Sequence, residues 1–187
     1  MRNYIYVYMK EPEIHVLGPG NRYGLWVQGC KQNCSGCVAY NAKDMNAGVP
    51  INIDALAFEI ALSNAEGITI SGGEPFLQAE ELYDLLCKIE KKRDMGVIVY
   101  TGYYYEDLIN IDAAKKMLTK IDLLIDGPYK KELDDGKNLR GSSNQRAILL
   151  TEKYKDYVKE FGVGERKREF FSHGIYVHEI GIPNENN

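Results

Sequence analysis

Short apolar runs alternate with amphipathic helical patterns along this chain, and that alternation restricts the possible folds more than any other feature. After a first alternating run at 3–9, strands are expected at 22–29, 67–73, 96–102 and 121–127. The helices expected between them cover 52–65, 78–94 and 109–120. Strand and helix in regular alternation indicate right-handed βαβ units and a parallel sheet. Asp54 is the predicted N-cap of the first helix, because its carboxylate can accept a hydrogen bond from the first turn.

The length of the chain limits how many such units it can hold. A full eight-fold barrel takes roughly 250 residues, and this chain has 187. We therefore expect an α/β fold, a partial open (β/α) barrel of about five to six units with a short C-terminal β extension. Residues 1–187 are expected to form a single domain, with 151–187 as the C-terminal extension. In that extension a short helix is expected at 151–162 and a hairpin around Ser172-His173-Gly174.

The charge distribution gives no reason to expect a nucleic acid or a membrane as partner. The formal net charge is −4, so no broad basic face is implied. The longest basic cluster, Glu165 to Glu169, carries its own acids and is interpreted as a solvated turn. No apolar run approaches the roughly 18–20 residues that span a bilayer, and the N-terminus does not resemble a signal peptide. We therefore expect a cytoplasmic protein, in which clustered cysteines are more often metal ligands or redox groups than disulfides.

Three of the four cysteines, Cys30, Cys34 and Cys37, lie within nine positions and allow three interpretations. A structural zinc site normally takes four ligands from two paired clusters. A dithiol redox pair of Cys34 and Cys37 leaves Cys30 unexplained. An iron–sulfur cluster held by three thiolates keeps one iron open for a substrate or cofactor, whereas a cluster that only carries electrons normally takes four. This last interpretation is favoured, with Cys87 expected on the apolar side of a helix.

Polar and glycine-rich segments follow the expected strands, where the carboxyl ends of parallel strands gather ligands. The first is the cysteine segment, and the next are 71–74, 101–103 and 126–127. Gly72 and Gly73 allow close approach of the backbone to a ligand, and the Glu74 carboxylate can hold an ammonium group. The alternative is a simple turn, with Pro75 opening the next helix.

The order of these motifs resembles the radical S-adenosylmethionine superfamily, whose members carry Cys-x3-Cys-x2-Cys after one strand and Gly-Gly-Glu-Pro after the next. Within it, the chain resembles the activating proteins of anaerobic (class III) ribonucleotide reductase. The stretches that carry the resemblance are "GPGNRYGLWVQGCKQNCSGC", "SGGEPF", "VYTGY", "LLIDGPY" and "RGSSNQR". They extend from about Gly18 to Arg146. The chain departs from many radical enzymes in having Gly36, rather than an aromatic residue, before the third cysteine.

The resemblance implies a redox enzyme that activates a partner. Cys30, Cys34 and Cys37 would bind a 4Fe–4S cluster, and S-adenosylmethionine would bind the open iron. An electron from a flavodoxin- or ferredoxin-like donor would lead to a 5′-deoxyadenosyl radical. That radical would remove hydrogen from a glycine of a glycyl radical enzyme, the large subunit of anaerobic ribonucleotide reductase.

The resemblance also implies which other residues contact the cofactor. Gly72, Gly73 and Glu74 would contact the methionyl amino group. The remaining residues assigned to cofactor binding are Thr101, Gly102, Asp126, Ser142 and Asn144. For three of these an alternative stays open: Asp126 can equally cap a helix, and Ser142 and Asn144 can belong to a hydrogen-bonded turn. Arg22 is interpreted as a surface or partner contact.

Two other functions remain open at this point. The chain can be another radical S-adenosylmethionine enzyme, acting on a different glycyl radical enzyme, a peptide or a small molecule. It can also be a non-catalytic interaction module that binds zinc or a cluster. The latter predicts no binding of S-adenosylmethionine.

Overall fold

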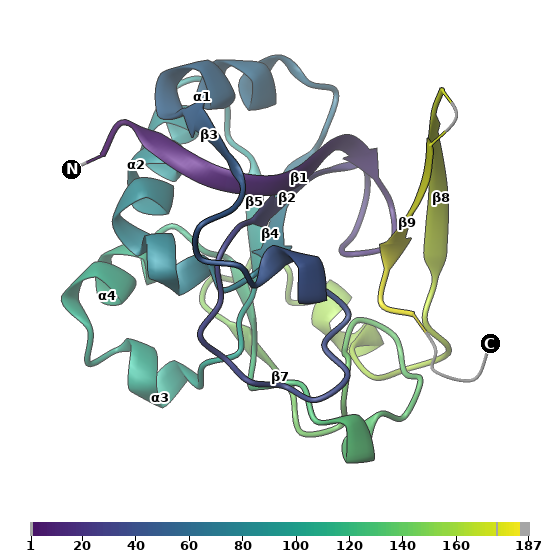
Figure 1. The fold of residues 1–187 in the computed structure, drawn as a ribbon. Coiled ribbons are helices and arrows are strands. Elements are labelled where there is room, and N and C mark those ends of the chain that lie inside the picture. The colour runs from purple at the N-terminus through teal and green to yellow at the C-terminus, as the bar shows by residue number, and fades with distance from the viewer. Residues whose placement is uncertain (1, 175, 184–187) are drawn as a thin grey trace.

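Seven strands form one sheet in the computed structural model, which describes residues 2–174 and 176–183 (Figure 1). Met1, Ile175 and 184–187 of the expected single domain therefore lie outside the described residues. In the order in which they pair, the strands are β3 (Val49–Asn52), β1 (Tyr4–Ile14), β2 (Arg22–Val27), β4 (Gly67–Gly72), β5 (Gly96–Tyr100), β6 (Leu123–Asp126) and β7 (Arg146–Leu149). The helices are α1 (Ile53–Leu62), α2 (Ala79–Glu90), α3 (Tyr105–Leu108) and α4 (Asp112–Leu118), and 3-10 turns cover Tyr40–Ala42, Pro75–Gln78, Lys131–Leu133 and Tyr157–Glu160.

The middle of the sheet is parallel and its edges are antiparallel. Strands β2, β4, β5 and β6 pair in parallel, in that order. Strands β1 and β3 on one side, and β7 on the other, pair antiparallel. Within the described residues the sheet stays open, with β3 and β7 as its edges, which confirms the open α/β fold class. The parallel repeat covers four strands and not five to six units, because the chain enters through β1 and returns in β7 in the opposite direction.

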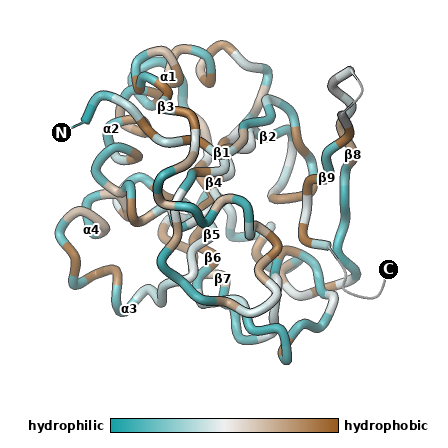
Figure 2. The backbone as a smooth tube through the Cα atoms, in the orientation of Figure 1, coloured by the Kyte–Doolittle hydropathy of each residue, from teal (hydrophilic) through white to brown (hydrophobic). Residues whose placement is uncertain are grey.

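The helices cover one face of the sheet and bury its apolar side chains. Side chains alternate between the two faces of a strand, so Tyr23, Leu25 and Val27 of β2 join the core beneath the helices. In Figure 1 the helices lie to the left of the sheet, and Figure 2 shows brown and teal stretches alternating along α1 and α2. Helix α2 buries Leu82 and Leu85 in this core. This face is therefore held mainly by the burial of apolar surface.

The N-cap of α1 is Asn52, two residues earlier than the predicted Asp54. The side chain of Asn52 accepts a hydrogen bond from the backbone N–H of Ala55 at 3.1 Å. The predicted cap, Asp54, lies inside the first turn, and its carboxylate pairs with Lys88 at 2.6 Å. The prediction of Asp54 as N-cap is wrong because both residues are good caps, and the end of β3 at Asn52 decides between them.

The last third of the chain covers the other face of the sheet. The predicted hairpin is confirmed as β8 (Arg168–His173) and β9 (Tyr176–Gly181), which lie to the right of the sheet in Figure 1. Ile180 of β9 is 1% exposed and packs with Ile14 and Trp26. In place of the short helix expected at 151–162, the segment contains a 3-10 turn at Tyr157–Glu160. The extension is therefore packed onto the sheet.

Two arginines that the sequence placed in solvent are buried on this second face. Arg22, interpreted as a surface or partner contact, is 1% exposed. Its guanidinium donates to the carbonyls of Ile68 at 2.6 Å and Gly96 at 3.1 Å and to the hydroxyl of Tyr154 at 2.8 Å. Arg166, in the cluster interpreted as a solvated turn, is 7% exposed. Both interpretations are wrong because backbone carbonyls from distant segments replace water around the guanidinium groups.

None of the helices in the part of the chain that the structure describes is both long and apolar enough to cross a membrane.

Candidate functional site

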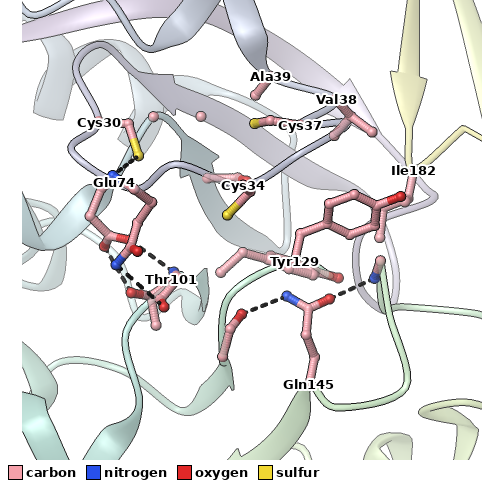
Figure 3. Close-up of a pocket in the computed structure, with 18 residues that line it drawn as sticks. Cys30, Cys34, Cys37, Val38, Ala39, Glu74, Thr101, Tyr129, Gln145 and Ile182 are labelled. Atoms are coloured by element: carbon pink, nitrogen blue, oxygen red, sulfur yellow. Dashed lines mark hydrogen bonds between the residues drawn. The ribbon is translucent and has the colours of Figure 1, made fainter. Parts of the chain in front are cut away.

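A cavity of about 140 Å³ lies at the carboxyl ends of the parallel strands, where the motifs were expected to meet (Figure 3). Three of its lining residues are the cysteines Cys30, Cys34 and Cys37. The remaining residues that line it are Gln32, Val38, Ala39, Ser71, Gly72, Gly73, Glu74, Tyr100, Thr101, Gly102, Gly127, Tyr129, Gly141, Gln145 and Ile182. The loops after β2, β4, β5 and β6 therefore converge on one cavity, as the parallel arrangement predicted.

The cysteine loop is held to its surroundings by backbone hydrogen bonds. Gly29 and Cys30 donate to the carbonyls of Ala42 at 2.7 Å and Lys43 at 3.1 Å. The thiol of Cys30 accepts from the backbone N–H of Gln32 at 3.3 Å. These contacts fix the start of the loop directly after β2.

Burial changes the acidity of two of the three thiols. It raises the pKa of Cys30, although the N–H of Gln32 opposes the shift. It also raises the pKa of Cys34, where the nearby thiol of Cys37 adds to the shift and the backbone N–H of Tyr129 opposes it. Without a metal these two thiols favour their neutral forms, and a cationic centre would be needed to stabilise them as thiolates.

Gly72 and Gly73 allow two loops to touch, which is a more specific role than approach to a ligand. A Cβ on Gly72 would lie 2.4 Å from the backbone nitrogen of Val27, and Gly72 has a φ of 109°. A Cβ on Gly73 would lie 2.2 Å from the carbonyl oxygen of Gly29. Because both contacts are with backbone atoms, a side chain at Gly72 would push the end of β4 away from β2, and one at Gly73 would push the loop after β4 away from the cysteine loop.

Glu74 is the buried acid of the site and joins the loops after β4 and β5. It is 1% exposed. One carboxylate oxygen accepts from the Thr101 hydroxyl at 2.8 Å and from the Phe76 N–H at 3.0 Å, and the other accepts from the Gly102 N–H at 2.8 Å. Burial raises the pKa of Glu74 to about 7, with these hydrogen bonds opposing the rise. Thr101 and Gly102, predicted as cofactor contacts, thus lie in the cavity wall beside Glu74.

Asp126 lies behind the cavity wall and does not line the cavity. It is fully buried and accepts from the N–H of Tyr105, at the start of α3, at 2.8 Å. It also accepts from Arg146, whose Nε lies 2.9 Å away. Its carboxylate therefore bonds within the protein, and its direct contact with a cofactor stays a prediction.

Ser142 and Asn144 similarly bond within their own loop. The Ser142 hydroxyl accepts from the N–H of Lys130 at 3.1 Å and donates to Asn144 Oδ1 at 2.8 Å. Asn144 donates to the carbonyl of Pro128 at 2.8 Å. These bonds connect the segment after β6 to the segment before β7. The hydrogen-bonded turn considered from the sequence thus describes their present contacts, and contact with a cofactor stays a prediction.

Several residues of the cavity wall had no role assigned from the sequence, among them Tyr129, Gln145 and Ile182 (Figure 3). Gln145 donates to the carbonyl of Gly127 at 3.0 Å and accepts from the N–H of Gly141 at 2.7 Å. Tyr129 and Gln145 belong to "LLIDGPY" and "RGSSNQR", so the signal was present without an assigned role. Nothing in the sequence marked Ile182, because its place depends on the hairpin folding back over the sheet.

The donor set fits an iron–sulfur cluster better than a single ion. Within the described residues, no group of three or more His, Cys, Asp or Glu side chains lies close enough to hold one metal ion. A single zinc ion requires its ligands to converge at about 2.3 Å from one point. A four-iron cluster instead takes each thiolate at a different iron, so three thiols spread along one cavity wall suit it.

Comparison with known proteins identifies the family. The model of the 4Fe-4S single cluster domain matches residues 16–148. The anaerobic ribonucleoside-triphosphate reductase-activating protein of Enterobacteria phage T4 is 34% identical over 137 residues, covering 70% of this chain and 85% of the relative. This chain belongs to the family of those activating proteins. The resemblance stated from its motifs is thereby confirmed, and the chain carries a 4Fe–4S cluster domain.

Two further relatives show how far the similarity extends. The protein of the same name from Pasteurella multocida is 32% identical over 163 residues, covering 80% of this chain and 99% of the relative. The pyruvate formate-lyase 1-activating enzyme of Escherichia coli K12 is 28% identical over 141 residues, covering 70% of this chain and 54% of the relative. Both names denote proteins that activate another enzyme.

Proposed function

We propose that this chain is a radical S-adenosylmethionine activase that generates a glycyl radical on an anaerobic ribonucleoside-triphosphate reductase. The observation that carries the proposal is the gathering of Cys30, Cys34 and Cys37 in the lining of one cavity, which Glu74 also lines. Membership of the family of reductase-activating proteins supports the choice of partner.

In this proposal each group of lining residues has its own role. Cys30, Cys34 and Cys37 hold the cluster. Gly72 and Gly73 keep the loop after β4 against the cysteine loop, and Glu74 receives the amino group of S-adenosylmethionine. When bound, the cluster and S-adenosylmethionine supply the reductive cleavage that yields methionine and a 5′-deoxyadenosyl radical able to take hydrogen from glycine.

Glu74 is suited to an amino group because its oxygens keep free acceptor capacity. A carboxylate has about four lone-pair sites, and three donors, from Thr101, Phe76 and Gly102, occupy the Glu74 oxygens. The three bonds hold the carboxylate in one orientation. An ammonium group placed nearby favours the charged form, so it would lower the pKa of Glu74 from about 7.

The finer expectations on partners and organisation form part of the same proposal. The electron comes from a flavodoxin- or ferredoxin-like donor, and the protein works in the cytoplasm without nucleic acid or membrane. Residues 1–187 act as a single domain, in which 151–187 extend the fold. Contact of Asp126, Ser142 and Asn144 with the cofactor is also part of this proposal, in addition to their contacts within the protein described above.

The proposal is tested on protein purified without oxygen and reduced with dithionite. We expect S-adenosylmethionine to change the paramagnetic resonance spectrum of the cluster and to be cleaved to 5′-deoxyadenosine. Adding the anaerobic reductase should then give a glycyl radical signal on that partner. The variant Cys34→Ala should abolish the last two signals, because one of three ligands is lost.

The outcome also separates the other two functions. Cleavage of S-adenosylmethionine with a radical on pyruvate formate-lyase, and none on the reductase, would favour the second activity, which the 28% identical relative motivates. A protein that binds zinc, or a reduced cluster that ignores S-adenosylmethionine, would contradict the proposal and favour an interaction module.

A further inference from the structure

One arginine of the C-terminal extension is buried beside the cavity, although its sequence neighbours Glu165 and Lys167 are exposed. The side chain of Arg166 is 1% exposed. It forms a two-pronged ion pair with Asp134, with Nη2 to Oδ1 at 2.6 Å and Nη1 to Oδ2 at 3.1 Å. Burial alone would raise the pKa of Asp134, but Arg166 holds it below its usual value. The buried charge is therefore paired, and the planar geometry fixes its orientation.

The same guanidinium donates hydrogen bonds to three backbone carbonyls. Its Nε donates to Arg140 at 2.9 Å, its Nη1 to Pro183 at 2.9 Å, and its Nη2 to Gly141. Together with the pair to Asp134, all five N–H donors of the side chain have an acceptor. Arg166 therefore joins the loop between β6 and β7 to the end of the described chain.

Both segments that Arg166 joins belong to the wall of the cavity. Gly141 lines the cavity, and so does Ile182, which directly precedes Pro183. A third wall residue, Tyr129, is connected through Asp134, because its hydroxyl donates to Asp134 Oδ2 at 3.1 Å.

The connection through Tyr129 reaches the cysteine loop. Tyr129 lines the cavity together with Cys34 of the cysteine loop (Figure 3). A Cβ on Gly141 would lie 2.9 Å from the ring of Tyr129, so the two wall residues are also in close contact. One buried side chain thus acts on three neighbouring parts of the wall.

The backbone of the loop indicates that its shape is imposed from outside. Leu139, directly before the two carbonyls that Arg166 binds, is 4% exposed and has a φ of 64°. This left-handed conformation is unfavourable for a residue with a branched side chain. Such a conformation persists only where the surrounding contacts determine it, and the bonds from Arg166 are such contacts.

We propose that Arg166 is a positioning residue of the cavity and that Ile182, which Arg166 holds through the neighbouring Pro183, forms part of the wall around S-adenosylmethionine. The identity of that ligand rests on the proposed function. The expected effect of Arg166 on the alkylation of Cys34 does not. A lysine has a single ammonium group in place of the five-donor plane, so Arg166→Lys should not restore the wall.

The first experiment titrates S-adenosylmethionine into the reduced, cluster-loaded protein and follows the resonance spectrum. For Arg166→Ala and Arg166→Lys we expect affinity to fall at least tenfold while the cluster content stays that of wild type, because the three cysteines are unchanged. The matched control is Arg168→Ala, which removes an arginine of the same extension whose Nη1 pairs with Glu179 at 3.2 Å. The control should stay within twofold of wild type, and wild-type affinity in both Arg166 variants would overturn the proposal.

A second experiment uses cluster-free protein and needs no S-adenosylmethionine. The rate of alkylation is measured separately for Cys34, which lines the cavity together with Tyr129, and for Cys30, whose thiol accepts a local hydrogen bond from Gln32. In Arg166→Lys we expect alkylation of Cys34 to be at least threefold faster, because a loosened wall exposes this half-buried thiol to the reagent, with Cys30 unchanged. Equal rates at Cys34 in the variant and in wild type would contradict the role of Arg166.

A third variant covers the case in which the arginine variants do not fold. Tyr129→Phe removes only the hydroxyl that reaches Asp134 and keeps the ring against Gly141. It should accelerate alkylation of Cys34 about twofold, and no acceleration would count against the proposal. If wild-type protein ignores S-adenosylmethionine, the proposed function fails, while the alkylation rates still decide whether Arg166 positions the wall.

Discussion

The two faces of the sheet are covered in different ways. Beneath the helices, apolar side chains such as Leu85 and Ile70 pack in one continuous core. The opposite face is covered by the last third of the chain and has two buried arginines, Arg22 of β2 and Arg166 of the extension, which bind backbone carbonyls. The first face depends on burial, which is non-directional. The second also depends on hydrogen bonds whose loss leaves buried acceptors without a partner.

This difference indicates where substitutions are tolerated. An apolar core accepts another side chain of similar volume at modest cost. A guanidinium with several buried acceptors has no equivalent replacement, because its donors are fixed in one plane. The two faces should therefore respond differently to conservative changes, and the following variants measure that difference as the free energy of unfolding of cluster-free protein in urea.

The largest effect is expected for Arg22. Arg22→Ala leaves the carbonyls of Ile68 and Gly96 and the hydroxyl of Tyr154 without their donor. We expect a loss of about 4 kcal/mol, because each buried unsatisfied group costs about 1–3 kcal/mol. Arg22→Lys should recover only about half of this. Full recovery by lysine would show that charge alone is required and would remove the contrast between the faces.

A slightly smaller effect is expected for Leu85, which is fully buried beneath the helices. Leu85→Ala should cost about 3 kcal/mol through lost burial and the resulting cavity. Leu85→Met should cost less than about 1.5 kcal/mol, because it conserves volume. If methionine costs as much as alanine, packing on this face is as specific as the hydrogen bonding on the other.

The free energy of unfolding should depend on pH through Glu74, which lies where both faces of the sheet end at the cavity. Its pKa of about 7 in the folded state lies above the ordinary value of 4.5, so the folded protein binds the proton more tightly. The contribution of the protonated Glu74 to the free energy of unfolding is complete below pH 4.5. It is lost as pH rises through 7, by up to about 3 kcal/mol. Unfolding at pH 5 and pH 7.5 measures it. The slope should disappear in Glu74→Gln, and an unchanged slope would assign it to another group.

The smallest effect tests the start of α1. Asn52→Ala removes the side-chain bond to the N–H of Ala55 and should cost about 1 kcal/mol. Asp54→Ala should cost about 0.5 kcal/mol, because its carboxylate is largely exposed. The reverse order would restore Asp54 as the functional cap and contradict the capping seen here.

The parts of the molecule that were predictable depend on local patterns. The alternating runs gave the parallel strands β2, β4, β5 and β6 and the hairpin of the extension. The spacing of Cys30, Cys34 and Cys37 gave the cluster segment. Strand order also placed Glu74 and Thr101 at one rim, because parallel strands end on the same side.

The parts that were not predictable depend on partners far apart in the chain. Ile182 reaches the cavity wall only because the hairpin folds over the sheet. Asp126 turned out to bond to Arg146, 20 positions away, and to the start of α3. A side chain that lies within a sequence motif can thus form its hydrogen bonds within the protein.

The sequence by itself determined the parallel strands with the helices between them, the family and the three thiols, because each follows from local patterns and spacing. Only the tertiary structure decided that Arg22 and Arg166 are buried. Within their own segments both are charged residues suited to water. Their burial depends on acceptors 46 residues from Arg22, at Ile68, and 32 residues from Arg166, at Asp134. A buried charge is stable only where such acceptors converge, and convergence is a property of the fold.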